Sequence, residues 1–320
     1  MSAGRLPLGG AHGPGRVSTS LAIGVFDGLH LGHRALLERA LARAREASGR
    51  PIVLSFDPHP DVVLSRGAFR IRAPLTPLPE KRRRLLAMGV DDLVVLPFTR
   101  ELASLEPEEF VDRYLVTPYA PSALVVGEGF ALGRNRTGTV ERLRAIGRAR
   151  GFEVEAVPLV QRDGGPISST RIRDLLAQGR VAEAGRLLGR SYELEGRVVG
   201  GEGIGRSLGY PTANLRLHHE KFLPADGIYA ARAQWEGAPW RLAAMSIGVR
   251  PTFDGRVRTV EVHVLDWSGE LVGRALEVEL VDWLRPEIRF ESSDALVQAM
   301  GQDVAETRRR LGPEARGVTT

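Results

Sequence analysis

The fold is read most directly from Ile23-Gly-Val-Phe-Asp-Gly-Leu-His-Leu-Gly-His33. The apolar run at 21–26 predicts a buried strand, and the Asp-Gly pair after it predicts a turn. Apolar residues at i, i+3 and i+4 from position 33 onward predict a helix. A helix N-terminus presents unpaired backbone N–H groups and the positive end of a dipole, so the turn suits a bound phosphate.

Two histidines and a glycine in this turn bear on its chemistry. Gly32 lets a ligand come close to the backbone, and His30 and His33, three residues apart, can face the same anion. Two imidazoles beside a phosphate suit phosphoryl or nucleotidyl transfer. An ordinary strand-to-helix turn with exposed histidines explains the same residues, so both interpretations stay open at this point.

Strands and helices alternate from residue 21 to about residue 188. Continuous apolar strands between amphipathic helices predict a Rossmann-like α/β domain with a parallel sheet buried on both faces. Such sheets bind ligands at the carboxyl ends of their strands, and the motifs of this half fall there. After the first strand and helix, strands are expected at 52–56, 93–96, 123–126 and 152–159, and helices at 79–88, 107–115 and 140–150.

A second candidate phosphate site is Ile167-Ser-Ser-Thr-Arg-Ile-Arg173. Ser169 or Thr170 can cap the helix that follows, and capping alone explains both hydroxyls. Capping does not require Arg173, and two hydroxyls, free amides and an arginine one turn later make an anion cradle.

Short alternating runs replace this rhythm near residue 189. They predict an antiparallel sheet that closes into a small barrel, followed by a C-terminal helix. The runs are 192–199, 228–235, 241–247, 259–265 and 276–283, and the helix is expected at 292–311. The predicted organisation is a disordered leader at 1–18, domains at 19–188 and 189–312, and a tail at 313–320.

The barrel half carries its own polar motifs. A glycine-dense loop at 200–205 could fold over phosphates or be a plain linker. In the extended run after it, Thr212 and Asn214 point to one face and offer oxygens that suit Mg²⁺. Further on, Glu261 and His263 face away from the neighbouring valines. Glu261 is therefore either a solvated carboxylate or a base that accepts a proton from an attacking hydroxyl.

Composition limits the classes of protein. The 320 residues include no cysteine, which excludes disulfides and a thiolate nucleophile. The net charge is +5, but the short arginine runs at 82–84 and 308–310 lie in helical patterns, so no nucleic-acid partner is expected. No run is apolar enough to span a membrane, and the first residues lack the apolar segment of a signal peptide. A cytoplasmic protein is expected.

The first half resembles the nucleotidylyltransferase superfamily. Its GxFDGxHxGH signature matches Gly24 to His33, and its ISSTxIR motif matches Ile167 to Arg173. The resemblance implies that His30 and His33 steady the α-phosphate of ATP. It places Ser169, Thr170 and Arg173 on the β and γ phosphates, and further ATP contacts at Gly24, Phe26, Asp27, Gly28 and Gly32.

The second half resembles riboflavin kinase, through Pro211-Thr-Ala-Asn214, Val260-Glu-Val-His263 and Leu284-Arg-Pro-Glu-Ile-Arg-Phe290. The resemblance implies that Thr212 and Asn214 bind magnesium-nucleotide and that Glu261 is the base. It also implies phosphate contacts at Gly203, Gly205 and Pro211, and flavin contacts at Arg285 in this half and at Asp57 and Pro58 in the first.

Together the halves resemble the bacterial bifunctional riboflavin kinase/FAD synthetases. Riboflavin, FMN and ATP are the implied substrates, Mg²⁺ is the implied cofactor, and a monomer or weak homo-oligomer is expected. The chain departs from the family at Gly129, Ala131 and Leu132, so a kinase with a weakened adenylyltransferase half is an alternative. Two further alternatives are an enzyme that activates another phosphorylated small molecule and a regulator that binds flavin or RNA.

Overall fold

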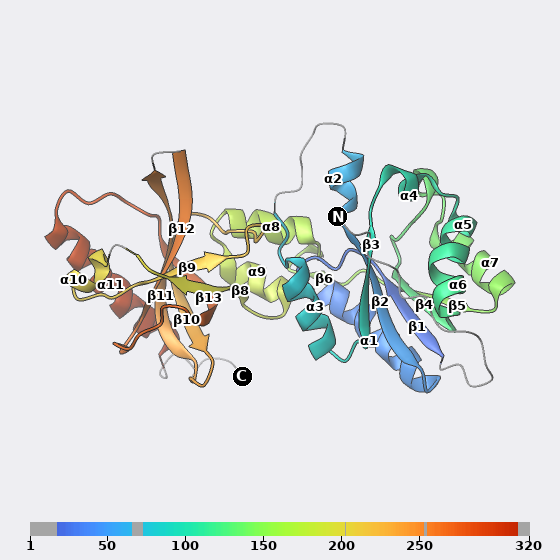
Figure 1. Cartoon of the computed structure of the whole chain (residues 1–320), viewed down its shortest axis with the longest axis horizontal. Helices are drawn as coiled ribbons and strands as arrows, with labels where there is room; N and C mark the ends of the chain where they lie inside the picture. The colour runs from blue at the N-terminus through green and yellow to red at the C-terminus, as the bar shows by residue number, and fades with distance from the viewer. Residues whose placement is uncertain (1–17, 66–72, 202, 253–254, 313–320) are drawn as a thin grey trace. The chain divides into compact units, whose positions relative to one another are not determined.

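The computed structural model describes residues 18–65, 73–201, 203–252 and 255–312. Its backbone divides into two compact units, Met1–Ile167 and Ser168–Thr320, each with elements of its own (Figure 1). The expected tail lies outside the described residues, as does the expected leader apart from Ser18.

The first unit is built on a five-stranded sheet in the order β3-β2-β1-β4-β5, with every pairing parallel. This confirms the predicted parallel sheet. The strands are β1 (Thr19–Ile23), β2 (Arg50–Asp57), β3 (Asp92–Pro97), β4 (Ala123–Gly127) and β5 (Glu153–Val157). The signature turn follows β1, so it lies at the carboxyl edge of the sheet.

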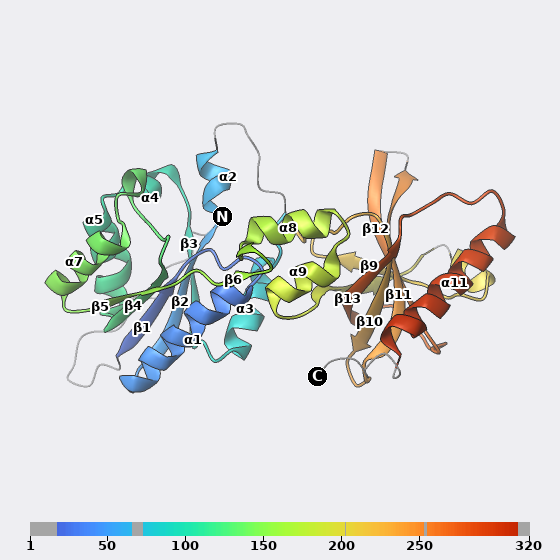
Figure 2. The ribbon, with the colours of Figure 1, turned by 180° about the vertical axis from the view of Figure 1, so that it is seen from behind.

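Helices cover both faces of this sheet (Figures 1 and 2). Apolar residues of α1 (Leu31–Glu46) and α3 (Leu78–Ala87) pack on one face, where Ala22 and Val53 are buried. Apolar residues of α5 (Pro107–Val111) and of later helices pack on the other face, over Leu21 and Leu54. The remaining elements are α2 (Pro60–Leu64), α4 (Arg100–Ser104), the π-helix η1 (Asp112–Val116), α6 (Thr117–Tyr119), the 3-10 helix η2 (Arg134–Arg136), α7 (Val140–Arg150), and the hairpin of β6 (Gln161–Arg162) and β7 (Gly165–Pro166).

Three expectations for this unit need correction. The first strand ends at Ile23 rather than at residue 26, because Phe26 has a left-handed backbone (φ +52°) that no strand can contain. The helix begins at Leu31, two residues earlier than expected. The helix expected at 107–115 changes into π geometry at Asp112.

The second unit begins with α8 (Ser169–Ala177) and α9 (Val181–Leu188) and continues into a closed barrel, as Figure 2 shows. The barrel order is β10-β11-β12-β9-β8-β13, with antiparallel pairing. Its strands are β8 (Tyr192–Val199), β9 (Ala213–Leu217), β10 (Gly227–Trp235), β11 (Arg241–Thr252), β12 (Gly255–Val264) and β13 (Ala275–Arg285). The predicted barrel and the C-terminal helix α11 (Ser293–Leu311) are confirmed.

Two elements of the barrel were not predicted as such. The extended run that holds Thr212 and Asn214 leads into β9, which joins β8 to β12 and closes the barrel. The glycine-dense loop leads into a short helix, α10 (Ile204–Ser207).

Candidate active sites

The histidine turn is made of unusual backbone. Phe26 and Leu29 have positive φ angles of 52° and 46°, and Gly28 between them has φ of 83°. Residues other than glycine adopt this region at a cost, and such strain persists only where the surroundings hold it in place. Phe26 is fully buried, which anchors the turn in the core of the first unit.

A segment distant in the sequence fixes the turn. The Asp27 carboxylate is buried and accepts hydrogen bonds from the backbone N–H groups of Leu75 (3.2 Å) and Thr76 (3.1 Å). The Thr76 hydroxyl oxygen in turn accepts a bond from Gly28 N–H at 2.9 Å. The side chains of Phe26 and Asp27 therefore shape the turn, so an ATP contact at either residue must come from backbone.

His30 is the N-cap of α1, and its Nδ1 accepts a hydrogen bond from the His33 backbone N–H at 3.3 Å. With Nδ1 accepting, Nε2 is the ring nitrogen of His30 that can donate a hydrogen bond. A side chain at Gly32 would press on the His30 ring, since an added Cβ would lie 3.2 Å from Nδ1. The glycine thus allows His30 to lie against the start of the helix.

The His33 ring stacks on the ring of His30, with centroids 3.7 Å apart and an interplanar angle of 14°. Burial lowers the pKa of His33 well below its usual value, and the nearby His30 and Lys81 lower it further. His33 is therefore neutral at pH 7. Its Nδ1 is buried and has no hydrogen-bond partner among the described residues. The pair thus presents at least one neutral imidazole, that of His33, at the start of the helix.

Two other predicted motifs stand at the same edge of the sheet. Asp57 and Pro58, at the end of β2, are exposed and joined by a cis peptide bond. After β4, Gly129 has open space where a side chain would be, and Leu132 is buried and forms a β-bridge with Gly138. Leu132 therefore serves packing.

The hydroxyl motif starts α8 in the second unit. Ser168, rather than Ser169 or Thr170, is the N-cap, because its side chain accepts a hydrogen bond from Arg171 N–H. Ser169 and Thr170 instead occupy the first turn of the helix, and Arg173 is buried with 8% of its surface exposed. Helix capping therefore does not explain the presence of Ser169 and Thr170.

The barrel contains two cavities that share Thr212. The first, about 300 Å³, has a mostly apolar lining with polar groups contributed by Glu261, His263 and Arg285. The second, about 240 Å³, lies against the glycine loop and includes Gly203, Pro211 and Asn214. Gly205, predicted with the phosphate loop, lines the first cavity.

Glu261 and Thr212 are in direct contact where the cavities meet. The Thr212 hydroxyl donates to Glu261 Oε2 at 3.1 Å, and Asn214 pairs with Glu261 across β9 and β12. The valines that alternate with Glu261 are buried, as expected. A threonine hydroxyl that donates its proton keeps lone pairs for a cation, so Thr212 and Asn214 fit a Mg²⁺ ion that takes its other ligands from phosphates and water.

Close packing accounts for two glycines of the loop, Gly201 and Gly205, whereas a side chain at Gly200 or Gly203 would meet open space. An added Cβ at Gly201 would lie 2.1 Å from Asn214 Nδ2, so only glycine permits this contact. His263, unassigned from sequence, lies 2.9 Å through Nδ1 from the Pro211 carbonyl oxygen and packs edge-on against Tyr210. Both contacts hold the run that carries Thr212.

Arg285 lies in the first cavity, where Asp303 holds it. Its Nε and Nη2 donate to the two carboxylate oxygens of Asp303 at 2.8 and 2.7 Å, and its guanidinium lies over the Phe290 ring. Asp303 is buried and comes from α11, so the C-terminal helix positions the arginine. No motif identified Asp303 in the sequence.

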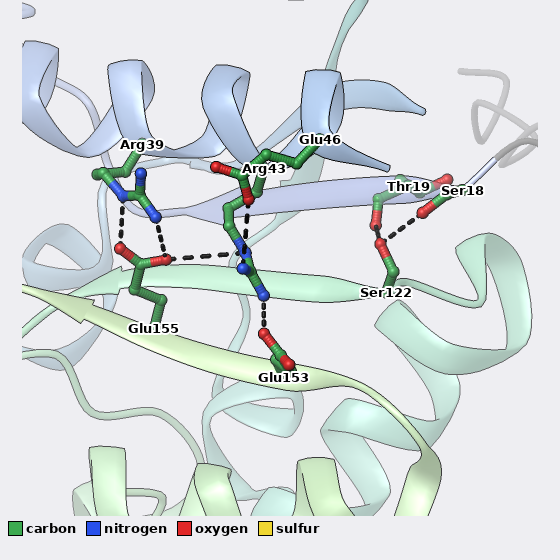
Figure 3. Close-up of polar contacts among 8 residues, drawn as sticks. All are labelled: Ser18, Thr19, Arg39, Arg43, Glu46, Ser122, Glu153 and Glu155. Carbon is green, nitrogen blue, oxygen red and sulfur yellow. Dashed lines mark hydrogen bonds and ion pairs between the residues drawn. The ribbon is translucent and has the colours of Figure 1, made fainter. Parts of the chain in front are cut away.

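A separate polar network lies at the amino edge of the first unit's sheet (Figure 3). Arg39 and Arg43 of α1 reach Glu153 and Glu155 of β5, with Arg39 Nε and Nη2 donating to the two Glu155 oxygens at 2.5 and 2.9 Å. These residues lie at the end of the sheet opposite the motifs, so they belong to the packing of α1 on β5.

The two sites define a class of protein: a transferase with a phosphate-suited site in each unit. A family model described as FAD synthetase matches residues 15–171, and one described as riboflavin kinase matches residues 188–311. The chain belongs to the family of bifunctional riboflavin kinase/FMN adenylyltransferases.

Relatives of that name are similar over nearly their whole length. The protein of Pseudomonas fluorescens is 39% identical, with 92% of this chain and 93% of the relative covered. That of Listeria monocytogenes is 35% identical, with 91% and 92% covered. A crystal structure from Streptococcus pneumoniae, described as a macrolide-efflux protein, is 33% identical with a TM-score of 0.83, covering 92% of this chain and 95% of that one. Among the described residues, no helix is long and apolar enough to cross a membrane.

Proposed function

We propose that the chain converts riboflavin to FMN in the barrel and FMN to FAD at the histidine turn, using one ATP in each step. Both family models and the curated relatives support these activities. The observation that carries the proposal is the contact of Thr212 with Glu261 where the two cavities meet. This contact places Glu261, the proposed base, beside Thr212, which also lines the glycine-loop cavity.

In the kinase step, riboflavin occupies the first cavity and the nucleotide occupies the second. Glu261 accepts the proton of the ribityl 5′-hydroxyl, and the hydroxyl oxygen bonds to the γ-phosphorus of ATP. The bond from that phosphorus to the β–γ bridging oxygen breaks, and ADP leaves. Gly203 and Pro211 of the second cavity are proposed to surround the phosphates, with Gly205 approaching them from the first cavity beside Thr212. Arg285, fixed by Asp303, is proposed to contact the flavin.

Thr212 and Asn214 are the proposed Mg²⁺ ligands. Their hydroxyl and amide oxygens lie beside the Glu261 carboxylate, and oxygen donors of this kind suit Mg²⁺. A bound Mg²⁺ neutralises phosphate charge. The hydrogen bond to Glu261 orients the Thr212 hydroxyl so that its lone pairs are free for this role.

In the second step, an FMN phosphate oxygen bonds to the α-phosphorus of ATP, and the bond from that phosphorus to the α–β bridging oxygen breaks. Pyrophosphate leaves as the FMN phosphate bonds, so the adenylyl group passes directly to FMN without a covalent enzyme intermediate. His30 donates from Nε2 toward the α-phosphate beside neutral His33, together with backbone N–H groups at the start of α1. Gly24, Gly28 and Gly32 are proposed to keep the turn close to ATP.

Other residues are proposed to hold the remaining parts of the substrates. Ser169, Thr170 and Arg173 bind the β and γ phosphates, and Asp57 and Pro58 contact the flavin of FMN. The functional domains are proposed as 19–188 and 189–312, although the compact units divide after Ile167. The protein is proposed to act in the cytoplasm as a monomer or weak homo-oligomer, without nucleic acid or membrane partners.

Product analysis tests the proposal. Purified protein is incubated with riboflavin, ATP and Mg²⁺, and the flavins are separated at successive times. We expect FMN first and FAD later. FMN that accumulates without FAD would overturn the second step. Unchanged riboflavin would overturn the first step, and FMN supplied with ATP and Mg²⁺ would then test the second.

A further inference from the structure

Only two lysines occur in the chain, Lys81 and Lys221, and all other basic side chains apart from histidine are arginine. Each lysine has 7% of its surface exposed. A guanidinium is a broad planar fork, whereas an ammonium is a compact charge on a flexible stem. In a chain that uses arginine at every other cationic position, two buried lysines mark places where only the compact charge fits.

Lys81 lies under the histidine turn. It stands on the buried face of α3, one turn before Leu85, and its Nζ donates to the Val25 carbonyl oxygen at 2.8 Å. The same carbonyl accepts a hydrogen bond from the Ser55 hydroxyl at 3.0 Å. Two donors from separate elements thus hold the residue directly before the left-handed Phe26.

The charges around Lys81 are few and defined. Asp27 and Asp57 interact electrostatically with its ammonium. On the side of the turn the ammonium interacts with His33, which stacks on His30. Burial lowers the pKa of Lys81, and the two carboxylates oppose that shift. Because the unfolded lysine binds its proton more tightly, the buried charge costs stability at neutral pH. Stability alone therefore does not explain a lysine here.

We propose that Lys81 is a positioning residue for adenylyl transfer, whose buried ammonium holds the Val25 carbonyl and thereby the histidine turn beneath the bound ATP. The inference rests on the proposed function of the first unit. A positive charge behind the turn favours a polyanion in front of it, while neutral His33 keeps a ring N–H group as a donor.

The test replaces Lys81 with methionine, which is similar in length and uncharged. We expect FAD formation from supplied FMN to fall at least about tenfold in kcat, with riboflavin phosphorylation by the same protein unchanged. We also expect no fall in melting temperature, because Ser55 still satisfies the Val25 carbonyl. In an NMR titration the His33 ring should take up its proton at a higher pH than in wild type, because a neighbouring positive charge has gone.

Ser55→Ala is the matched control, since it removes the neutral donor to the same carbonyl. We expect it to reduce FAD formation less than about threefold and to leave the His33 titration unchanged. An equal loss in both variants would overturn the role of the charge, as would an unmoved His33 titration in Lys81→Met. A melting temperature that falls together with activity would show a purely structural lysine. If wild-type protein makes no FAD from FMN, the proposed function itself fails.

Discussion

At the histidine turn the functional groups stand on irregular backbone, whereas in the barrel they stand on paired strands. His30 and His33 follow two residues with left-handed φ angles, and Asp27 and Thr76 hold that backbone. Glu261, by contrast, takes its direction from the alternation of β12 and from its pairing with β9. The first site therefore depends on support from residues far along the chain, and the second depends on strand register.

This difference predicts how the two sites fail. Substitutions in the barrel should remove a chemical group and leave its neighbours in place, because hydrogen-bonded strands fix the backbone. Substitutions under the turn should disturb several groups together. Three of the four experiments below use the two activities of one chain as controls for each other, and the fourth measures stability alone.

The largest effect is expected for Glu261→Gln. Glutamine keeps an oxygen that can accept from Thr212 but cannot take up the substrate proton. Riboflavin phosphorylation should fall about 10²- to 10⁴-fold, while FMN adenylylation stays at the wild-type rate. Steady-state rates for each half-reaction provide the measurement. Glu277→Gln, on β13 and outside both cavity linings, should keep full kinase activity. A fully active Glu261→Gln enzyme would rule out the base.

The double variant His30→Asn/His33→Gln should produce the next largest effect. Asparagine remains a good N-cap, so α1 keeps its start while the imidazoles are lost. Adenylylation should fall about 10²-fold, and FMN formation should not change. The exposed stacked pair His218 and His219 offers a control, because the same two substitutions there should alter neither activity. Retention of FAD synthesis in the first variant would place the chemistry elsewhere.

A smaller effect is expected from Thr76→Val, which removes the hydroxyl oxygen that accepts from the buried Gly28 N–H. The free energy of unfolding of the first unit should fall by about 1–3 kcal/mol, and FAD synthesis should fall more than FMN synthesis. Chemical denaturation followed together with both activities tests this. Thr137→Val, on an exposed hydroxyl that donates to Arg134 O, is the control for loss of a threonine hydroxyl. Equal losses from the two substitutions would contradict the special role of the turn.

The smallest effect concerns pH. The folded pKa of His33 lies below the unfolded value of 6.5, so between these two values the unfolded chain binds more protons. Stability of the first unit should be unaffected by this group above pH 6.5 and should decrease as the pH falls toward the folded pKa. Thermal melts from pH 7.5 downward should show a shallower decline for His33→Gln than for wild type. Identical declines would mean that the ring is not buried.

Periodicity was enough to predict much of the fold. The helix Val140–Arg150 and the strand Tyr192–Val199 have the bounds that their patterns predict, because each is a regular element with one buried face. The strand before the signature was predicted too long. Its apolar letters continue to Phe26, but the left-handed turn already begins there. The pattern of apolar residues in a sequence indicates which residues are buried, but it does not indicate their backbone φ angles.

The supporting residues of the sites could not be predicted in the same way. Thr76, Lys81 and Asp303 contact their partners across long stretches of chain, and no local motif marks them. The two lysines gave the one usable signal, because they are exceptions in a chain of arginines. Pairing of Glu261 with Asn214 likewise required the register of β9, which the pattern did not reveal.

The ion pairs on β5 have a consequence for association between molecules. β5 is an outer strand of an open sheet, and an outer strand can recruit a strand from another chain. This edge strand carries fixed charges, because Glu153 and Glu155 pair with Arg39 and Arg43. An apolar strand that docked there would have to desolvate these charges. The barrel needs no such protection, because its closed ring of strands has no edge strand. Neutralising both glutamates should therefore promote aggregation of this protein through its first unit.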